Sequence, residues 1–142
     1  MPPLRSIISL GLQFGKVHTT TSKTLTLMKE VNVIKHFCDW WWGSSVDIVK
    51  EDGTAIVCVK FDKKSFPKTG YICDLSVSAY CRENGIGTQM MLFAIGECKD
   101  NGMTFARLHV DAKNVWLREW YERLGLKELS RDENEIEMIK EL

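Results

Sequence analysis

A glycine-punctuated turn, Arg82–Thr88, joins a strand-like stretch to an amphipathic helical stretch. Gly85 and Gly87 let the backbone turn tightly and approach a ligand without a Cβ in the way. The first amides of the following helix have no acceptor within it, and with the helix dipole they suit a phosphate or pyrophosphate. The turn therefore predicts an anion site, although such a turn also occurs for its geometry alone.

Two common phosphate-binding motifs do not fit this turn. The GxxxxGK[ST] pattern of the Walker loop is absent from the sequence. The dinucleotide fingerprint needs a third small residue, and Met90 stands at that position. No carboxylate stands out at a strand end about 20 residues further on. The ordinary nucleotide-binding folds are therefore disfavoured.

Two ordered motifs lie between Tyr71 and Leu126. The first is Leu75-Ser76-Val77 followed by Arg82-x-x-Gly85-x-Gly87. The second is Leu108-x-Val110-x-x-x-Asn114 followed by Leu117, Tyr121, Gly125 and Leu126. In this order and spacing they resemble the acetyl-CoA-binding half of the GCN5-related N-acetyltransferase (GNAT) family. Three positions depart from the family's usual pattern: Ala79 replaces a common proline, Leu117 a small residue and Leu126 a phenylalanine.

The resemblance implies a fold and a reaction. The fold would be of mixed α/β class, with a central twisted mixed sheet that splits around the cofactor and is flanked by helices on both faces. Residues 1–142 would form a single N-acetyltransferase domain whose cofactor-binding core spans about 71–126. The reaction would transfer an acetyl group from acetyl-CoA, used as a co-substrate without a metal, to a primary amine in a ternary complex.

The resemblance also implies which residues hold the cofactor. The amides of residues 84–88 would receive the pyrophosphate, the Leu75–Val77 edge would bind the pantetheine arm, and the Val77 amide would face the developing oxyanion. Asn114 would contact the same arm or its neighbouring strand. The predicted cofactor-binding set is Leu75, Val77, Arg82, Asn84, Gly85, Ile86, Gly87, Thr88 and Asn114.

Catalysis needs an acid for the leaving thiolate and a base for the incoming ammonium. Tyr121 stands where the family places its general acid, and a phenol of pKa about 10 can protonate a thiolate whose conjugate acid is near 8.5. Asp74 and His109, on neighbouring predicted strands, are both candidates for the base, and both are equally read as structural groups. Cys73 and Cys81 lie near the site in sequence without a histidine placed to activate them, so direct attack by the amine is favoured.

The run Trp40-Trp41-Trp42 is unusual. Successive residues of a helix point about 100° apart, so three adjacent indoles cannot all face one core. Trp41 and Trp42 are therefore candidates for an aromatic wall that receives the substrate, and a helix end wedged against the sheet explains them equally well. Two other functions stay open: a non-catalytic CoA-binding module, and a protein-interaction domain that uses the Trp40–Trp42 cluster.

The composition of the sequence limits the classes of partner that we expect the protein to bind. The 19 basic and 19 acidic residues cancel, whereas nucleic-acid-binding domains usually have a basic excess. No stretch approaches the roughly 20 consecutive apolar residues of a membrane span. We therefore expect acetyl-CoA and an amine as partners, with no nucleic acid or membrane, and the resemblance is compatible with a homodimer.

The cysteines and the N-terminal residues indicate in which cellular compartment the protein is expected. The five cysteines are irregularly spaced and include no CxxC pair, which favours free thiols in a reducing compartment and a cytoplasmic location. No acidic residue precedes Glu30, so an organelle transit peptide is an alternative.

The elements that must position these residues follow from periodicity. Ile7–Leu12 and Lys23–Lys29 are read as strands, and apolar residues at helical spacing from Glu30 to Trp41 predict a helix that Gly43 stops. Asp52-Gly53 predicts the turn of a hairpin. The remaining predictions are a hairpin over Val46–Lys60, strands at Tyr71–Val77 and Phe105–Asp111, helices at Met90–Lys99 and Val115–Leu124, and a last strand within Lys127–Leu142.

Overall fold

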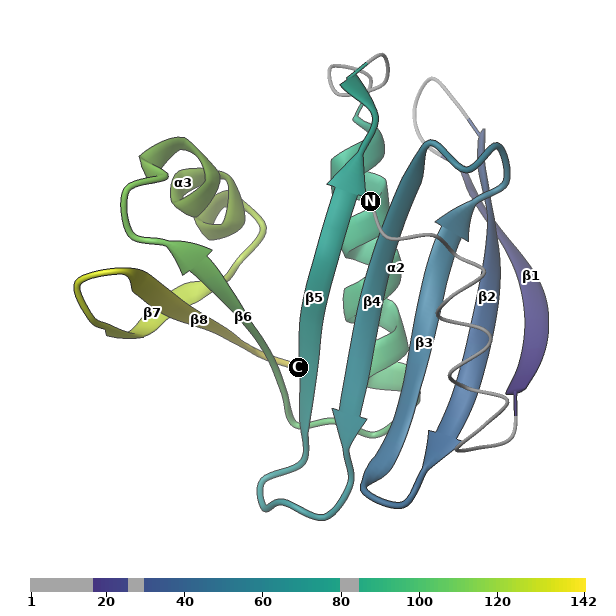
Figure 1. The fold of residues 1–142 in the computed structure, drawn as a ribbon, viewed down its shortest axis with the longest axis horizontal. Coiled ribbons are helices and arrows are strands. Elements are labelled where there is room, and N and C mark those ends of the chain that lie inside the picture. Colours follow the sequence, from purple (N-terminus) through teal and green to yellow (C-terminus); the bar gives the residue numbers. More distant parts are fainter. Residues whose placement is uncertain (1–16, 26–29, 80–84) are drawn as a thin grey trace.

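The computed structural model describes residues 17–25, 30–79 and 85–142, with side chains from Val31 onward (Figure 1). The described elements, in chain order, are β1 (Val17–Leu25), β2 (Glu30–Trp40), β3 (Gly43–Lys50), β4 (Ala55–Asp62), β5 (Thr69–Val77), α2 (Ile86–Asp100), β6 (Phe105–Asp111), α3 (Val115–Arg123), β7 (Lys127–Arg131) and β8 (Glu135–Glu141). Two predicted segments fall wholly or partly outside these residues, namely Ile7–Leu12 and the end of Lys23–Lys29.

The strands form one 8-stranded mixed sheet in the order β1-β2-β3-β4-β5-β6-β8-β7. Strands β1 to β5 are antiparallel neighbours. Strands β5 and β6 are parallel, because α2 carries the chain back along the sheet between them. Figure 1 shows α2 lying across the middle strands. The prediction of a mixed sheet flanked by helices is confirmed.

Alternation along the strands sorts side chains onto two faces. One face is apolar: Val46 and Ile48 of β3 and Val57 and Val59 of β4 are fully buried and belong to the same core cluster as α2. Tyr121 of α3 belongs to this cluster too, so both described helices cover the same face. Helices were expected on both faces, and within the described residues the second face carries none.

The helix predicted from Glu30 is wrong, because Glu30–Trp40 is strand β2, paired with β1 and β3. Val31 and Val33 are buried on the helix-covered face, as alternation in a strand requires. β-branched residues prefer strands, and the apparent helical spacing arose because residues facing both sides of the sheet are apolar. Gly43 does not stop a helix. It ends the tight turn before β3, where a Cβ would lie 2.0 Å from the Phe61 carbonyl oxygen.

Most other predicted elements are confirmed. The hairpin with its turn at Gly53 is β3–β4, and the strand from Tyr71 is β5. The predicted helices correspond to α2 and α3, with Gly125 in a left-handed conformation just after α3. The tail forms two strands rather than one. All five residues of β7 are exposed, so this strand leaves no hydrophobic pattern in the sequence.

Candidate active site

The sheet splits between β5 and β6. Residues Thr69–Tyr71 pair with Phe105–Arg107, and beyond them the two strands diverge, as Figure 1 shows. The ring of Tyr71 and the guanidinium of Arg107 lie 5.8 Å apart at the point of divergence. A parallel pair that opens in this way exposes strand edges inside the sheet, where an extended ligand can add hydrogen bonds.

A bulge in β5 borders the split. Ile56 pairs with Ser76 while Cys58 pairs with Cys73, so β5 has one more residue than β4 over this stretch. The extra residue distorts the backbone, and Asp74 adopts φ 56°. A positive φ in a residue other than glycine is a strained conformation that gathers at functional sites, as do bulges.

A cavity of about 200 Å³ occupies the split, and it is lined by Ile72, Cys73, Asp74, Leu75, Leu108, His109 and Tyr121. The structure therefore brings together all three residues predicted to be catalytic, Tyr121, Asp74 and His109, although they come from three different elements. Leu75, from the predicted cofactor-binding set, is in the same wall.

Tyr121 is the most enclosed of the three residues predicted to be catalytic, with 7% of its surface exposed. Its ring lies 5.1 Å from that of Trp120, in a tilted arrangement. Burial raises the pKa of the phenol above its ordinary value, because the phenolate would lose its hydration. Tyr121 therefore keeps its proton at neutral pH and can serve as a donor.

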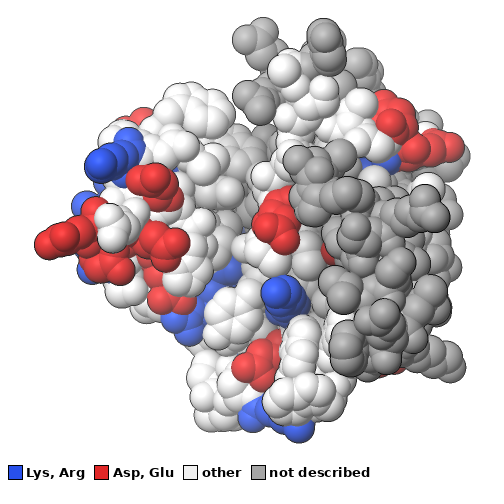
Figure 2. Space-filling model, in the orientation of Figure 1, with Lys and Arg blue, Asp and Glu red and all other residues white. Residues whose placement is uncertain are grey.

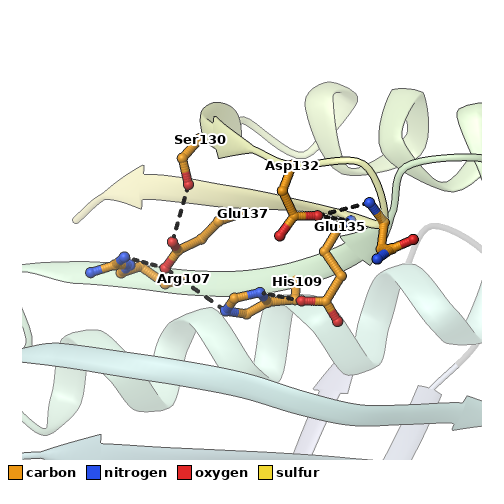
Figure 3. A network of polar contacts seen from close by, with 7 residues as sticks. Arg107, His109, Ser130, Asp132, Glu135 and Glu137 are labelled. Atoms are coloured by element: carbon orange, nitrogen blue, oxygen red, sulfur yellow. Dashed lines mark hydrogen bonds and ion pairs between the residues drawn. The ribbon is translucent and has the colours of Figure 1, made fainter.

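His109 lies at the rim of the cavity among carboxylates (Figure 3). Its Nδ1 is 3.2 Å from Glu135 Oε2, and its Nε2 is 3.9 Å from Glu137 Oε1. Glu137 also forms an ion pair with Arg107. A further hollow of about 180 Å³ joins this network to Ser130, Arg131 and Asp132. Figure 2 shows one group of acidic side chains at the left of the molecule, where Figure 1 places β7 and β8.

The start of α2 has the features of an anion site. Gly85 adopts φ 73° and precedes the helix, and the first intrahelical bond runs from the Gln89 amide to the Gly85 carbonyl. The amides of residues 86–88 therefore have no acceptor within the helix, and its first turn has no acidic side chain. Amides so placed, with the helix dipole behind them, suit the diphosphate of a coenzyme A.

Gly87 lies between this anion site and the cavity. A Cβ built on Gly87 would lie 3.6 Å from Trp120 and 3.8 Å from Val77. The space beside Gly87 is thus bounded by α3 and by the end of β5. A ligand held at the α2 amides reaches the split between β5 and β6 without crossing a strand, so the residues present fit an extended thioester cofactor.

The remaining predicted cofactor residues have mixed outcomes. Val77 and Thr88 are half-buried near the split, while the Ile86 side chain is buried in the core, which leaves its amide for the ligand. Asn114 caps α3, because its Oδ1 accepts a hydrogen bond from the Leu117 amide at 3.1 Å. Its contact with the cofactor stays a prediction. Arg82 and Asn84 lie outside the described residues, as does Cys81.

The structure does not bring the predicted substrate-binding tryptophans to the Tyr121 cavity. Trp41 is 81% exposed at the turn between β2 and β3, with Lys64 over its ring at 4.9 Å. Trp42 lines a separate hollow of about 330 Å³ together with Lys60, Asp62 and Tyr71. The prediction that at least one indole is near the surface is confirmed, and a role in substrate binding stays a prediction.

Sequence reasoning set aside one wall residue, Cys73. It is half-buried in the cavity wall, and its partner across the ladder is the buried Cys58. The only sequence signal was that each cysteine lies in a strand-like stretch, and strand register, which places them opposite each other, is not visible in a single sequence.

The described residues form neither a metal-ion cluster nor a membrane-spanning helix. Within residues 31–79 and 85–142, no three or more His, Cys, Asp or Glu side chains gather closely enough to hold a metal ion. The described helices include none that is both long and apolar enough to cross a membrane.

Known proteins resemble this chain in sequence and in fold. The sequence model of the Acetyltransferase (GNAT) family matches residues 18–126. A comparison with curated protein sequences gives no significant match.

Several solved structures share the fold. The NatC complex bound to Gag peptide and CoA aligns with a TM-score of 0.61 at 20% identity, covering 69% of this chain and 70% of that one. Naa50 from Arabidopsis thaliana, in complex with the bisubstrate analogue CoA-Ac-MVNAL, aligns with a TM-score of 0.59 at 19% identity, covering 69% and 72%. Ard1 from Thermoplasma volcanium aligns with a TM-score of 0.57 at 18% identity, covering 72% of each chain.

Proposed function

The chain belongs to the GNAT acetyltransferase family, and we propose that it transfers an acetyl group from acetyl-CoA to a primary amine by direct attack in a ternary complex. The observation that carries the proposal is the position of Tyr121 in the split between β5 and β6. The same split adjoins the free amides of α2 through Gly87. A diphosphate-binding helix start and a buried phenol therefore serve one extended ligand.

Tyr121 would protonate the leaving thiolate. The phenol stays protonated at neutral pH because its pKa is raised by burial. The same burial disfavours the thiolate that departs beside it, so the proton affinities of the two groups remain comparable. General acid catalysis of this kind contributes typically ~10²–10⁴ to the rate.

The bulged segment of β5 would stabilise the oxyanion. The extra residue at Asp74–Leu75 leaves part of the backbone unpaired with β4, in a segment whose residues Asp74 and Leu75 line the cavity. A backbone amide aimed at the developing oxyanion is worth ~3 kcal/mol of barrier. The assignment of this role to the amide of Val77 remains a prediction from the family resemblance.

The acidic rim supports an amine as the acceptor. Glu135 and Glu137 flank His109 at the mouth of the cavity, and Asp132 shares the adjoining hollow. A group of carboxylates attracts a cationic ammonium and raises its local concentration. Two of the solved structures with this fold hold peptide ligands, so a peptide amine is the first acceptor to test.

The first experiment measures cofactor binding. Thermal unfolding is followed with and without acetyl-CoA, for the wild type, for Gly87→Leu and for Gly96→Ala. Gly96 lies in the same helix with open space around it, so its variant is the matched control. At 100 times its Kd the ligand stabilises the fold by about 2.7 kcal/mol, a shift of several degrees. The shift is expected in the wild type and the control, and not in Gly87→Leu.

The second experiment measures acetyl transfer. The wild type is incubated with acetyl-CoA and three amines: a peptide with a free N-terminus, an N-capped peptide with one lysine, and spermidine. Mass spectrometry detects the acetylated product. Binding of acetyl-CoA without transfer to any amine would favour the non-catalytic CoA-binding module, and absence of binding to a folded wild type would refute the proposal.

A further inference from the structure

A transverse row of polar side chains crosses the sheet on the face that carries no described helix. His36 of β2 pairs with Asp47 of β3, Asp47 pairs with Cys58 of β4, and Cys58 pairs with Cys73 of β5. Cross-strand partners project from the same face of a sheet, so these four side chains form a continuous line. The line ends at the cavity, where Cys73 is part of the wall.

Burial increases along this row from Cys73 to Asp47, and His36 beyond Asp47 is half-buried. Cys73 is half-buried, whereas Cys58 is 9% exposed and Asp47 is 5% exposed. Cys58 is the direct cross-strand partner of both Asp47 and Cys73, so its thiol lies between the Asp47 carboxyl group and the Cys73 sulfur. A buried carboxyl group is thus joined to the cavity wall through two thiols and no other described side chain. His36 and Lys60 favour the charged form of Asp47, and Asp74 opposes it.

We propose that Cys73 is the base that takes a proton from the incoming ammonium, and that Cys58 and Asp47 form a buried proton relay behind it. The proposal rests on the proposed acetyl transfer and assigns a residue to the one step for which the sequence left two candidates, Asp74 and His109. Cys73 is the catalytic residue, because it lines the cavity. Cys58 and Asp47 act through it and are positioning residues.

The relay has two proton placements. In the first, Cys73 holds a thiol, the Cys58 thiol donates to Asp47, and Asp47 is a carboxylate. In the second, the Cys73 proton has moved to Cys58 and the Cys58 proton to Asp47, which leaves Cys73 as a thiolate beside a Cys58 thiol donor. The number of protons is the same in both.

The reaction then balances. The Cys73 thiolate takes a proton from the ammonium, and the neutral amine attacks the thioester carbonyl. The nitrogen loses its second proton to water as the C–S bond breaks, while Tyr121 gives its proton to the sulfur of CoA and is reprotonated from water. After the product leaves, Cys73 releases its proton to solvent. The net change is one acetyl group transferred and one proton released.

The charges around Cys73 are consistent with this cycle. Its pKa is lowered chiefly by the Cys58 hydrogen bond, and Lys60 adds to the lowering, while burial, Asp74 and Asp47 oppose it. Burial raises the pKa of Asp47, which favours the placement in which Asp47 holds the proton. Tyr121 and His109 face Cys73 across the cavity.

Cys73 fits the role better than the two earlier candidates. Asp74 is exposed and sits on the strained bulge, where its carboxylate is in contact with water. His109 is held at the rim by Glu135 and Glu137. Cys73 alone among the three combines a place in the wall with a buried acceptor behind it.

The first test is independent of turnover. With reductant removed just before use, the rate of Cys73 alkylation by iodoacetamide is followed against pH by peptide mass spectrometry. Cys58→Ala is expected to move the midpoint upward, toward the value of about 8.5 of an ordinary thiol, because the donor to the thiolate is lost. Cys58→Ser keeps a donor and is expected to stay near the wild type. Cys38→Ser, a buried cysteine on the same face, is the control. Equal midpoints for Cys58→Ala and the wild type would overturn the relay.

The second test uses the amine that the wild type acetylates fastest among the three named above. Cys73→Ala is expected to lower kcat/KM roughly 100-fold or more and to remove the acid limb of its pH profile, with acetyl-CoA stabilisation unchanged. Cys73→Ser provides a second folded variant with the same expected loss. Asp47→Asn is expected to lower kcat with little change in KM.

Two results would overturn the assignment while leaving the proposed function intact. One is wild-type kcat/KM in a folded Cys73→Ala. The other is an acetylated Cys73, trapped in the wild type with acetyl-CoA and no amine and then consumed when the amine is added, because it would make Cys73 a nucleophile. Failure of the wild type to bind acetyl-CoA would instead refute the proposed function itself, and the base assignment with it.

Discussion

The Lys35 ammonium on β2 lies 2.5 Å from the Glu97 carboxylate on α2, and this ion pair is almost fully enclosed. The side chains are 13% and 7% exposed. The same ammonium lies 5.7 Å from the centre of the Phe93 ring. The pair connects α2 to a strand that is 62 residues away in the sequence, on the side of the sheet far from the cleft.

Removal of one partner from this pair is expected to destabilise the fold strongly. Glu97→Leu leaves the Lys35 charge buried and uncompensated, which costs ~3–5 kcal/mol of the free energy of unfolding. The double variant Lys35→Met with Glu97→Leu removes both charges and is expected to recover most of that loss. Urea unfolding of the three proteins measures both quantities. A single variant that loses less than about 1 kcal/mol would show that the pair is solvated.

Two glycines of the same helical segment are expected to respond to alanine with opposite signs. Gly85 adopts φ 73°, so Gly85→Ala strains the backbone and lowers stability by about 1 kcal/mol. Gly96 lies within α2 with no atom within 4 Å of a built Cβ, so Gly96→Ala raises stability by about 1 kcal/mol. The Tm measured by thermal unfolding should fall by about 3 °C in Gly85→Ala and rise by about 3 °C in Gly96→Ala. Shifts of the same sign would contradict the assigned conformation of Gly85.

Tyr121→Phe is expected to lower kcat by roughly two to four orders of magnitude without weakening acetyl-CoA binding. The phenol is the active form, and its pKa is raised by burial above the ordinary value of 10. The wild-type rate should therefore not fall through deprotonation of Tyr121 until the pH exceeds about 10. A pH profile of kcat for both proteins tests this. A basic limb near pH 8 that vanishes in Tyr121→Phe would contradict the raised pKa.

Asn114 is expected to contribute to stability through its cap. Asn114→Ala removes the acceptor of the Leu117 amide and should cost about 1 kcal/mol, while Asn114→Asp keeps an acceptor and should cost little. Calorimetry of the free proteins measures this difference. If Asn114 also contacts the cofactor, the acetyl-CoA-induced shift will be smaller in both variants, and an undiminished shift will restrict Asn114 to capping.

The parts of the fold that could be predicted have local signals. The β3–β4 turn is specified by Asp52-Gly53, and α2 by the glycines before it and its apolar face. The grouping of Tyr121, Asp74 and His109 was predicted because the ends of β5 and β6 and the helix after β6 carry the recognised spacing.

The parts that were missed depend on contacts distant in sequence. β2 was read as a helix because Lys35 and Phe37 face the core while Ile34 and His36 face the other side, which mixes the strand period. The buried Lys35 is explained only by Glu97, which no pattern near Lys35 indicates. The row from His36 to Cys73 depends on the register of three strand pairs, which a single sequence does not reveal.

The order of the strands in the sheet determines which of them can pair while the chain is still being synthesised on the ribosome. β8 inserts between β6 and β7, so β7 is synthesised before β8, the strand with which it pairs among the described residues. Until β8 emerges, the strand pairing of β6 within the described residues is limited to Thr69–Tyr71 of β5. The β6 side of the split between β5 and β6 is therefore completed after the rest of the sheet. A nascent chain that stalls before Glu135 would leave the edge of β6 that pairs with β8 without its partner strand, and an unpaired edge of this kind favours wrong pairing with other chains.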